Sequence, residues 1–285
     1  MNNETESVCV FVRAYNAGRF IVDCLKSLRE SAYPGKIYVK ILFDEGTNDN
    51  TLEILNNIDF NTFNANNRDF EIIKHQNSSP FRALLKYGFE RFEDKYSYYA
   101  ILDYDNLYSL DYINLAIKHI SRNPNGNFLY STPKIIDASG NEIGYLTKKP
   151  ALPLKFLKYR ILFSNFIDAS AIFMDQNCLE IIISRLRRLR SSTFDWIFED
   201  WLIGALSLKY CTVNFLPEFK VYYRIHESNT TIQNSKAEKD GTNYNRSLLT
   251  ILALIFLNDD YKLLKIVGIF SLMQSLPHFL KNRRS

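Results

Sequence analysis

The stretch Ile101-Leu102-Asp103-Tyr104-Asp105-Asn106 joins an apolar run to two carboxylates that stand one residue apart. The apolar residues from Tyr98 to Leu102 predict a strand that is buried in a core. In open α/β sheets, ligands bind beyond the carboxyl ends of the strands. Hard cations such as Mg²⁺ take carboxylate oxygens together with substrate phosphates. Because surface loops also produce an Asp-x-Asp often, its meaning depends on the segments that accompany it.

The segments before this stretch predict an α/β fold with a mostly parallel sheet. Apolar runs at Val8–Val12, Ile37–Phe43 and Glu71–Lys74 precede the strand at Tyr98–Leu102, and helical patterns separate them. A continuously apolar strand is typical of a sheet that is covered on both faces. The further expected elements are helices at about 80–92, 110–120, 178–190 and 198–209, and strands at 128–136, 169–174, 212–216 and 220–223.

Composition indicates a protein with a sizeable core and no general affinity for nucleic acid. Of the 285 residues, 46% are hydrophobic and 14% aromatic, and the net charge is +4. From Lys236 onward there are eight basic and four acidic residues, so the tail carries 8 − 4 = +4 and the body is neutral. A nucleic-acid binder is expected to carry its basic face across the folded body.

Several features favour a cytoplasmic protein. The start of the chain is polar and acidic, and the four cysteines show no paired spacing, as in a reducing compartment. The apolar run Leu248–Leu257 is too short to span a bilayer. Residues 263–280 form a basic amphipathic segment that ends in Lys281–Arg284. It could lie on an anionic membrane surface or pack on the rest of the protein.

Five short motifs follow one another in a set order. They are Arg13–Asn16 after the first strand, Asp44–Asp49 after the second, Asp103–Asp105, Phe198–Trp201, and Tyr223–Asn229 near the end. With these motifs the chain resembles the family 2 glycosyltransferases, many of them bacterial, which are inverting enzymes of the GT-A fold. Their pattern is Tyr-Asn, Asp-Asp-Gly-Ser-x-Asp, Asp-x-Asp, Glu-Asp and Arg-x-His. The resemblance covers about residues 7–232.

The resemblance implies a domain organisation. Residues 1–232 would form the GT-A catalytic domain, with a nucleotide-binding half at about 7–110 and an acceptor half at 111–232. Residues 233–285 would form a helical tail that either contacts the membrane or packs on the catalytic domain. Acceptor specificity is expected to depend on residues 148–167 and on the region before Asp200.

The resemblance also implies a donor site. The residues expected to line the nucleotide pocket are Arg13, Tyr15, Asp44, Glu45, Arg82 and Asp103. Asp103 and Asp105 would hold Mn²⁺ or Mg²⁺ against the donor diphosphate, and His226 would complete the metal shell. The residues themselves allow simpler interpretations: exposed acids at a strand end, a plain turn at Asp44 and Glu45, a surface arginine, and a histidine that only makes structural hydrogen bonds.

Asp200 is the expected catalytic base, and Asp195 is its nearest competitor. Inverting transfer needs one carboxylate within hydrogen-bond reach of the acceptor hydroxyl. From the residues alone, Glu199 and Asp200 would equally suit the start of a helix, where a negative charge is favourable. The resemblance to the glycosyltransferases favours the catalytic role.

Together these expectations describe a metal-dependent, inverting hexosyl- or N-acetylhexosaminyltransferase. It would move one sugar from a nucleotide-sugar, with UDP the expected nucleotide, to a hydroxyl of a cell-surface glycan or a lipid-linked acceptor. Its place would be the cytoplasm, either free or at the cytoplasmic face of the inner membrane. The chain lacks the Gln-x-x-Arg-Trp signature of processive relatives. It also departs from the family at Arg13, where Pro or Thr is usual, and at Glu45, where Asp is usual.

Two other functions compete with this one. A non-catalytic sugar-nucleotide or glycan-binding module on the same fold would agree with the departures at Arg13 and Glu45. A nucleotidyltransferase would need a glycine-rich basic loop after the first strand, but Arg13–Phe20 holds a single glycine. The retained acids Asp103, Asp105 and Asp200 favour the glycosyltransferase.

Overall fold

The protein is described by a computed structural model. The described residues are 6–60, 67–76, 80–89, 96–120, 125–146, 156, 160–161, 165–187, 198–216, 218, 220–229 and 251. Asp195 and the tail after residue 232, apart from Ile251, lie outside them. Much of the expected acceptor region at 148–167 does so too. The division into halves and tail therefore stays a prediction.

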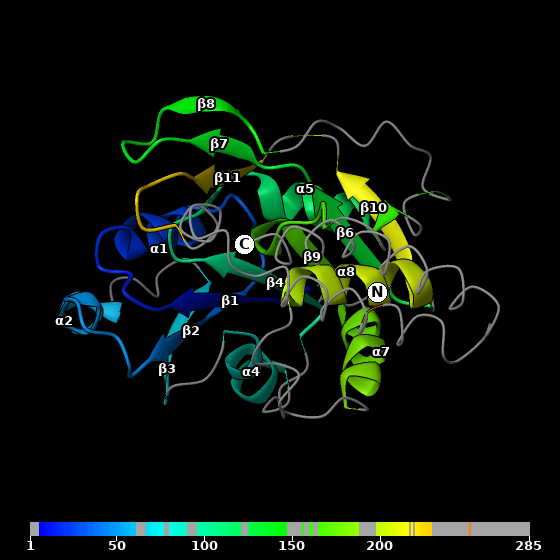
Figure 1. Cartoon of the computed structure of the whole chain (residues 1–285), viewed down its shortest axis with the longest axis horizontal. Helices are drawn as coiled ribbons and strands as arrows, with labels where there is room; N and C mark the ends of the chain where they lie inside the picture. The colour runs from blue at the N-terminus through cyan, green and yellow to red at the C-terminus, as the bar shows by residue number, and fades with distance from the viewer. Residues whose placement is uncertain are drawn as a thin grey trace, which may run out of the picture.

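A seven-stranded sheet forms the centre of the molecule (Figure 1). Its order is β10-β6-β9-β4-β1-β2-β3, and every neighbouring pair is parallel except those of β9, which runs antiparallel to β4 and β6. The bounds are β1 (Val8–Ala14), β2 (Ile37–Asp44), β3 (Arg68–His75), β4 (Tyr98–Asp103), β6 (Asn127–Ser131), β9 (Ile172–Asp175) and β10 (Thr212–Leu216). The predicted α/β fold with a mostly parallel sheet is confirmed.

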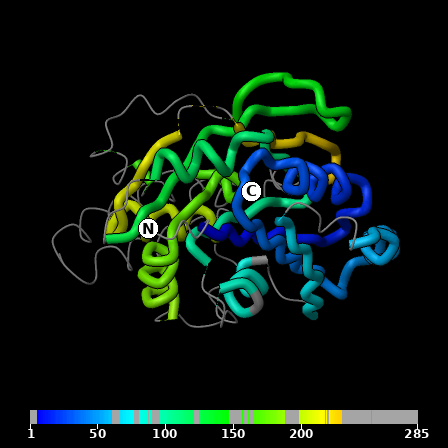
Figure 2. Tube along the Cα trace, turned by 180° about the vertical axis from the view of Figure 1, so that it is seen from behind, coloured from blue at the N-terminus to red at the C-terminus, as the bar shows by residue number. Residues whose placement is uncertain are grey.

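Helices cover both faces of this sheet, so each face has its own apolar core. One core contains α1 (Ile21–Arg29), α2 (Thr51–Asn57) and α5 (Tyr112–His119). The other contains α4 (Pro80–Ala83), the π-helix η1 (Leu84–Phe89), α7 (Gln176–Leu186) and α8 (Glu199–Tyr210). Both views show α1 and α5 on one side and α4 and α7 on the other (Figure 1, Figure 2). Within the described residues, no helix combines the length and apolar character needed to cross a bilayer.

Alternate residues of β1 supply the two cores. Val8, Val10 and Val12 belong to the core with α1, whereas Cys9 and Phe11 belong to the other, and all five are fully buried. Burying a side chain of this size contributes roughly 1.5–3 kcal/mol. This two-sided burial explains why the strand is apolar from Val8 to Val12. Arg13 and the polar residues after it lie at the carboxyl end of the strand.

A smaller sheet lies beside the large one and brings the last motif to it. Its order is β5-β11-β7-β8, with β5 (Leu107–Tyr108), β11 (Val221–Arg224), β7 (Lys134–Ile136) and β8 (Glu142–Tyr145). Strand β11 is parallel to β7 and antiparallel to β5, which follows Asp105 directly. The segment from Arg224 onward is thereby held next to the end of β4.

Three predicted elements differ from the structure. The strand expected at 128–136 is two strands, because Pro133 cannot donate a ladder hydrogen bond, and β6 and β7 belong to different sheets. The strand expected at 169–174 begins with the 3₁₀ turn η2 (Ala169–Ala171). The helix expected at 80–92 starts as α4 and continues as the π-helix η1. The second difference places the polar side chain of Ser170 beside the end of β4.

Candidate active site

The end of β4 is joined to the start of α8 by Arg13. Arg13 and Asp103 are neighbours in the register of β1 and β4. The Arg13 Nε donates to Asp103 Oδ1 at 2.7 Å, and Arg13 Nη2 lies 2.5 Å from the same oxygen. Arg13 Nη1 also pairs with Glu199. One guanidinium therefore links the first acid of the Asp-x-Asp motif to the Glu-Asp pair.

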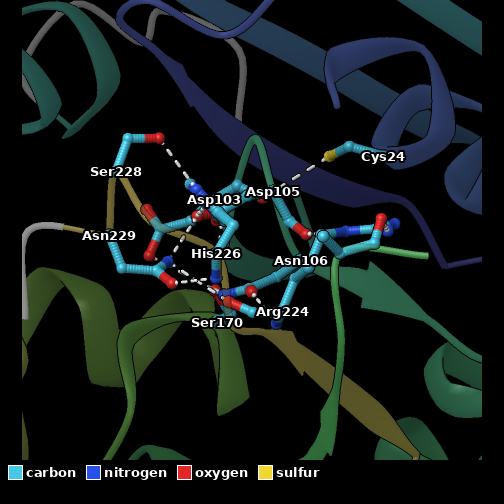
Figure 3. Close-up of polar contacts among 10 residues, drawn as sticks. Cys24, Asp103, Asp105, Asn106, Ser170, Arg224, His226, Ser228 and Asn229 are labelled. Atoms are coloured by element: carbon cyan, nitrogen blue, oxygen red, sulfur yellow. Dashed lines mark hydrogen bonds and ion pairs between the residues drawn. The ribbon is translucent and has the colours of Figure 1, made fainter. Parts of the chain in front are cut away.

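Asp105 faces a different set of partners, shown in Figure 3. Its Oδ2 lies 2.9 Å from His226 Nε2 and accepts a hydrogen bond from Asn229 Nδ2 at 3.1 Å. The other ring nitrogen of His226 lies 2.8 Å from Ser228 Oγ. Burial raises the pKa of Asp105, and the hydrogen bond with His226 opposes that rise. The buried carboxylate and the buried imidazole are thus held at hydrogen-bond distance from each other.

Arg224 is the scaffold of this arrangement. Its side chain is buried, and its Nε donates to the Asp105 carbonyl oxygen at 3.0 Å. Its Nη2 pairs with Asp23 of α1 at 3.3 Å. The guanidinium carbon lies 4.7 Å from the centre of the Phe20 ring, which also packs against the His226 ring at 4.7 Å. Arg224 is the arginine of the Arg-x-His motif that the sequence predicted. In the structure it fixes the backbone at Asp105.

The turn η2 brings two side chains to the same edge because β9 runs in the reverse direction. The buried Ser170 Oγ accepts hydrogen bonds from the Asp103 N–H at 3.1 Å and from Asn106 Nδ2 at 2.8 Å. Asp168 caps the turn, and its Oδ1 accepts from the Ser170 N–H at 2.9 Å. The sequence analysis missed both residues. The signal available was a polar Asp-x-Ser inside an apolar segment.

Asp200 is the second residue of α8 and lies near the same acids. Its Oδ1 accepts from the Trp201 N–H at 2.7 Å, and its side chain is also hydrogen-bonded to Asn165. Burial raises the pKa of Asp200, the hydrogen bond with Asn165 and the charge of Arg13 oppose the rise, and the charge of Asp103 adds to it. The buried Trp201 ring donates to the Ile161 carbonyl and anchors the helix start.

Asp168 responds to the same charges. Burial of its carboxyl group, followed by the charges of Asp103 and Asp200, raises the pKa of Asp168 to about 8, and Arg13 opposes the rise. We call the carboxyl groups of Asp103, Asp168, Glu199 and Asp200 around Arg13 the acid cluster. The structure brings three predicted residues, Arg13, Asp103 and Asp200, into this cluster.

The turns after β1 and β2 form a second part of the site. Three backbone N–H groups donate to side-chain oxygens across the two turns: Ala17 to Thr51 Oγ1 at 2.7 Å, Gly18 to Asp49 Oδ2 at 3.0 Å, and Asn48 to Asn16 Oδ1 at 2.9 Å. A Cβ on Gly18 would lie 2.1 Å from Asn50 Oδ1, so a larger residue there would have to displace the Asn50 side chain. We call residues 16–18 and 48–51 the turn clamp.

The residues predicted to line the nucleotide pocket lie on or near these turns, with one in a separate helix. Tyr15 is 52% exposed, directly before the turn clamp. Asp44 accepts from the Gly46 N–H at 2.8 Å, and the exposed Glu45 donates its N–H to the His75 carbonyl at 2.8 Å. Arg82 lies in α4, between β3 and β4, and is half-buried. Their nucleotide-binding roles stay predictions.

The metal ligands can be tested against the donor atoms present. Among the residues that the structure describes, no three acidic, histidine or cysteine side chains gather in one metal-binding group. Asp103 is engaged by Arg13, which leaves Asp105 and His226 as the pair best suited to a cation. The Asp105 Oδ2 and His226 Nε2 atoms are 2.9 Å apart, a hydrogen-bond distance. A carboxylate oxygen and an imidazole nitrogen are both metal donors, so a cation held by this pair would take the place of the proton between them.

Solved structures with a similar fold carry nucleotide-sugars. S. aureus TarS, residues 1–349, in complex with UDP-GlcNAc, is 16% identical with a TM-score of 0.55, covering 87% of this chain and 66% of that one. The mannosyltransferase PcManGT of Pyrobaculum calidifontis, in complex with GDP-Man and Mn²⁺, is 14% identical with a TM-score of 0.52, covering 87% and 69%. The chain spans only 37% of the longer TarS structure.

The sequence itself matches one family. No curated protein sequence matches the chain significantly. The profile of Glycosyl transferase family 2 matches residues 9–181, more than half of the chain. This span begins in β1 and ends in α7, and it includes the turn clamp, the Asp-x-Asp motif and Asp168. The chain therefore belongs to glycosyl transferase family 2 and has its GT-A fold.

Proposed function

We propose that the protein is an inverting, metal-dependent glycosyltransferase that moves one sugar from a nucleotide-sugar to an acceptor hydroxyl. The observation that carries the proposal is the pairing of two sites at one sheet edge. Asp105 and His226 offer a cation two donor atoms, and Asp200 offers a half-buried carboxyl group within the charge field of Asp103. A donor sugar between these two sites would have the departing diphosphate on one side and the general base, Asp200, on the other.

The metal half would hold the donor diphosphate. Asp105 and His226 would bind Mn²⁺ or Mg²⁺, which supplies Lewis-acid stabilisation of the charge that builds on the departing nucleotide. Arg224 and Asn229 keep the two ligands in place through the Asp105 carbonyl and carboxylate. The nucleoside would lie over the turn clamp, where Tyr15 and Glu45 are exposed to meet it.

Asp200 would act as the general base. Its carboxylate takes the proton of the acceptor hydroxyl while the new bond to the anomeric carbon forms and the bond from that carbon to the diphosphate breaks. A single displacement of this kind inverts the anomeric centre and needs no covalent sugar intermediate. Burial raises the pKa of Asp200, and a base with a raised pKa accepts a proton more readily.

The donor and acceptor are proposed from the fold neighbours and from the sequence. The neighbours carry UDP-GlcNAc and GDP-Man, which supports a hexosyl or N-acetylhexosaminyl donor, with UDP the first nucleotide to test. A hydroxyl of a cell-surface glycan or a lipid-linked glycan is the proposed acceptor. The basic tail would bring the protein to the cytoplasmic face of the membrane, where such an acceptor would be presented.

Thermal unfolding with UDP and with GDP, each with and without Mn²⁺, tests the donor site. A ligand at a hundred times its dissociation constant stabilises the native state by about 2.7 kcal/mol. We expect this stabilisation to require Mn²⁺ and to disappear in Asp105→Ala. Glu142→Gln on the exposed hairpin of β7 and β8 is the control variant and should retain it.

The other outcomes discriminate between functions. If neither nucleotide stabilises the protein, the donor site is contradicted and a glycan-binding module becomes the better hypothesis. If nucleotide-sugars bind without any transfer or slow donor hydrolysis, a non-catalytic sugar-nucleotide module is favoured. Stabilisation by UDP that does not need Mn²⁺ would contradict the metal assignment and leave the nucleotide pocket in place.

A further inference from the structure

The acid cluster holds more negative charge than its arginine can balance. Arg13 pairs directly with Asp103 and Glu199. Asp168 and Asp200 both lie within the field of Arg13 and Asp103. Four carboxylates and one guanidinium would carry −4 + 1 = −3 if every acid were ionised. A group of hydrogen-bond donors that enters this space would be strongly attracted.

The structural task of Asp168 does not explain why it is an acid. Its Oδ1 caps η2 by accepting the Ser170 N–H at 2.9 Å, and its carbonyl accepts the Ala171 N–H at 3.0 Å. An uncharged Ser, Thr or Asn caps a turn equally well. Asp175, the cap of α7, is a contrasting case, because its second oxygen accepts two hydrogen bonds from Asn127. Asp168 instead has two acids nearby, which makes a carboxyl group an unfavourable choice for a cap alone.

The position of Asp168 is fixed relative to the reacting groups. Ser170, two residues later, is buried and hydrogen-bonded to the Asp103 backbone at 3.1 Å. Ile167 and Ala169 on either side are buried as well, whereas Asp168 keeps part of its surface exposed. The residue is therefore held rigidly at the edge of the sheet and is still accessible to a ligand.

We propose that Asp168 binds hydroxyl groups of the sugar that is being transferred, and so contributes to donor-sugar specificity. The inference rests on the proposed function. In that reaction the anomeric carbon lies between the diphosphate, held at the end of β4, and the acceptor hydroxyl, held by Asp200. Asp168 accepts the Ser170 N–H at 2.9 Å, and Ser170 Oγ accepts the Asp103 N–H at 3.1 Å, so Asp168 lies beside the end of β4 and next to the place of the sugar ring.

The chemistry suits a sugar. An ionised carboxylate accepts hydrogen bonds from hydroxyl groups, and a protonated carboxyl group can also donate one. Because the pKa of Asp168 is raised to about 8, the group holds its proton near neutral pH in the empty site and can serve in either way. No covalent step is involved, and the number of bound protons is unchanged when a hydroxyl replaces water.

Binding measurements on Asp168→Ala and Asp168→Asn test the inference. Titration calorimetry with Mn²⁺ present would compare UDP with UDP-GlcNAc, and GDP with GDP-Man, on the full chain. A hydrogen bond to an acid in a buried site is worth about a tenfold change in affinity or more. We expect the alanine variant to bind the nucleotide-sugar about tenfold more weakly and the free nucleoside diphosphate within twofold of the wild type. The asparagine variant retains the cap, so its affinity for the nucleotide-sugar should lie between that of the alanine variant and that of the wild type.

The controls separate the possible failures. Asp175→Asn changes an acid cap at the opposite end of β9 and should leave both affinities unchanged. Equal weakening of nucleotide and nucleotide-sugar in Asp168→Ala would indicate a structural role and overturn the inference, as would unchanged binding of the nucleotide-sugar. If the wild type binds none of the four ligands, the proposed function fails, and the inference fails with it. Failure of Asp168 alone leaves wild-type binding intact, so the two results cannot be confused.

Discussion

The turn clamp and the acid cluster lie at the same sheet edge, but they are held together in opposite ways. In the turn clamp, backbone N–H groups meet side-chain oxygens at 2.7–3.0 Å, so each donor has a fitted acceptor. In the acid cluster, several carboxyl groups share one guanidinium, and burial raises the pKa of Asp168 and Asp200. The first region is stable as it stands, and the second is electrostatically unfavourable until a ligand arrives.

Under the proposed function, the turn clamp would bind the nucleotide and the acid cluster would carry out the reaction. A surface that must recognise a flat nucleoside benefits from a shape that is fixed before binding. A site that must stabilise a reaction places its charges in advance, at a cost in stability to the folded protein. Substitutions in the two regions should therefore differ in sign, in pH dependence and in whether rate or stability changes.

The largest effect is expected for Asp200→Asn. The amide retains the shape and the hydrogen bond from the Trp201 N–H, but it cannot accept a proton. General-base catalysis contributes about 10²–10⁴-fold, so kcat should fall by that factor. Steady-state kinetics gives the rate, and calorimetry with UDP and Mn²⁺ should give unchanged nucleotide affinity. Turnover near that of the wild type would place the base elsewhere, and Asp195 is the next residue to test.

A smaller effect, on stability, is expected for Thr51→Val in the turn clamp. Thr51 is fully buried, and its Oγ1 accepts the Ala17 N–H at 2.7 Å, so valine leaves that buried donor without an acceptor. Such a loss costs about 1–3 kcal/mol. Urea unfolding should show it equally from pH 5 to pH 9. Thr47→Val is the matched control, since Thr47 Oγ1 is buried with no hydrogen-bond partner among the described residues, and its free energy of unfolding should change little. Equal effects of the two variants would contradict the role of the clamp hydroxyl.

The smallest effect is expected for Asp168→Asn, and it is an increase in the free energy of unfolding, not a decrease. The groups that face Asp168 are the acids Asp103 and Asp200 and the cation Arg13, and Tyr108 and Tyr112 also lie in its field. A carboxyl group with a raised pKa holds its proton longer in the folded state than in the unfolded one. The folded state therefore loses stability as the pH rises from about 4 towards 8.

Asparagine cannot ionise, so the stability of Asp168→Asn relative to the wild type should increase as the pH rises from about 4 to 8. The pH-dependent part of the difference should vanish near pH 3, below the pKa of the carboxyl group in both states. Unfolding at pH 3, 6 and 8 measures it. A difference that does not vary with pH would show that the acid cluster imposes no electrostatic cost at Asp168.

Much of the fold could be predicted because strands that are buried on two faces appear in the sequence as runs of consecutive apolar residues. β1, β2 and β4 are mostly apolar, and their predicted limits agree with the structure to within two residues at each end. The reverse direction of β9 could not be predicted, because direction depends on which strands lie beside it and not on its own residues. For the same reason the sequence did not reveal that β6 and β7 belong to different sheets, since Ser131 and Lys134 look like parts of one strand.

The site was predictable where its residues stand in recognisable motifs. Asp103, Asp105, Asp200 and His226 each follow or begin an element, and the structure gathers them at one edge, although their roles remain proposals. Asp168 was missed because its importance comes from neighbours that are distant in the sequence. Arg13 was assigned to the nucleotide pocket, a role that stays a prediction, and nothing in its own segment indicated that it would bridge Asp103 and Glu199.

The partners of Asp105 also have a consequence for the synthesis of the protein. Asn229 follows Asp105 by 124 residues, and Arg224 follows its partner Asp23 by 201. At about 5–20 residues per second, a ribosome needs roughly 6–25 s to pass from Asp105 to Asn229. During that interval β1, β2 and β4 can already pair, while the acids of β4 have no imidazole beside them. Under the proposed function, the turns that would bind the nucleotide form first, and the pair of residues that would hold a metal is complete only when synthesis has passed the last strand.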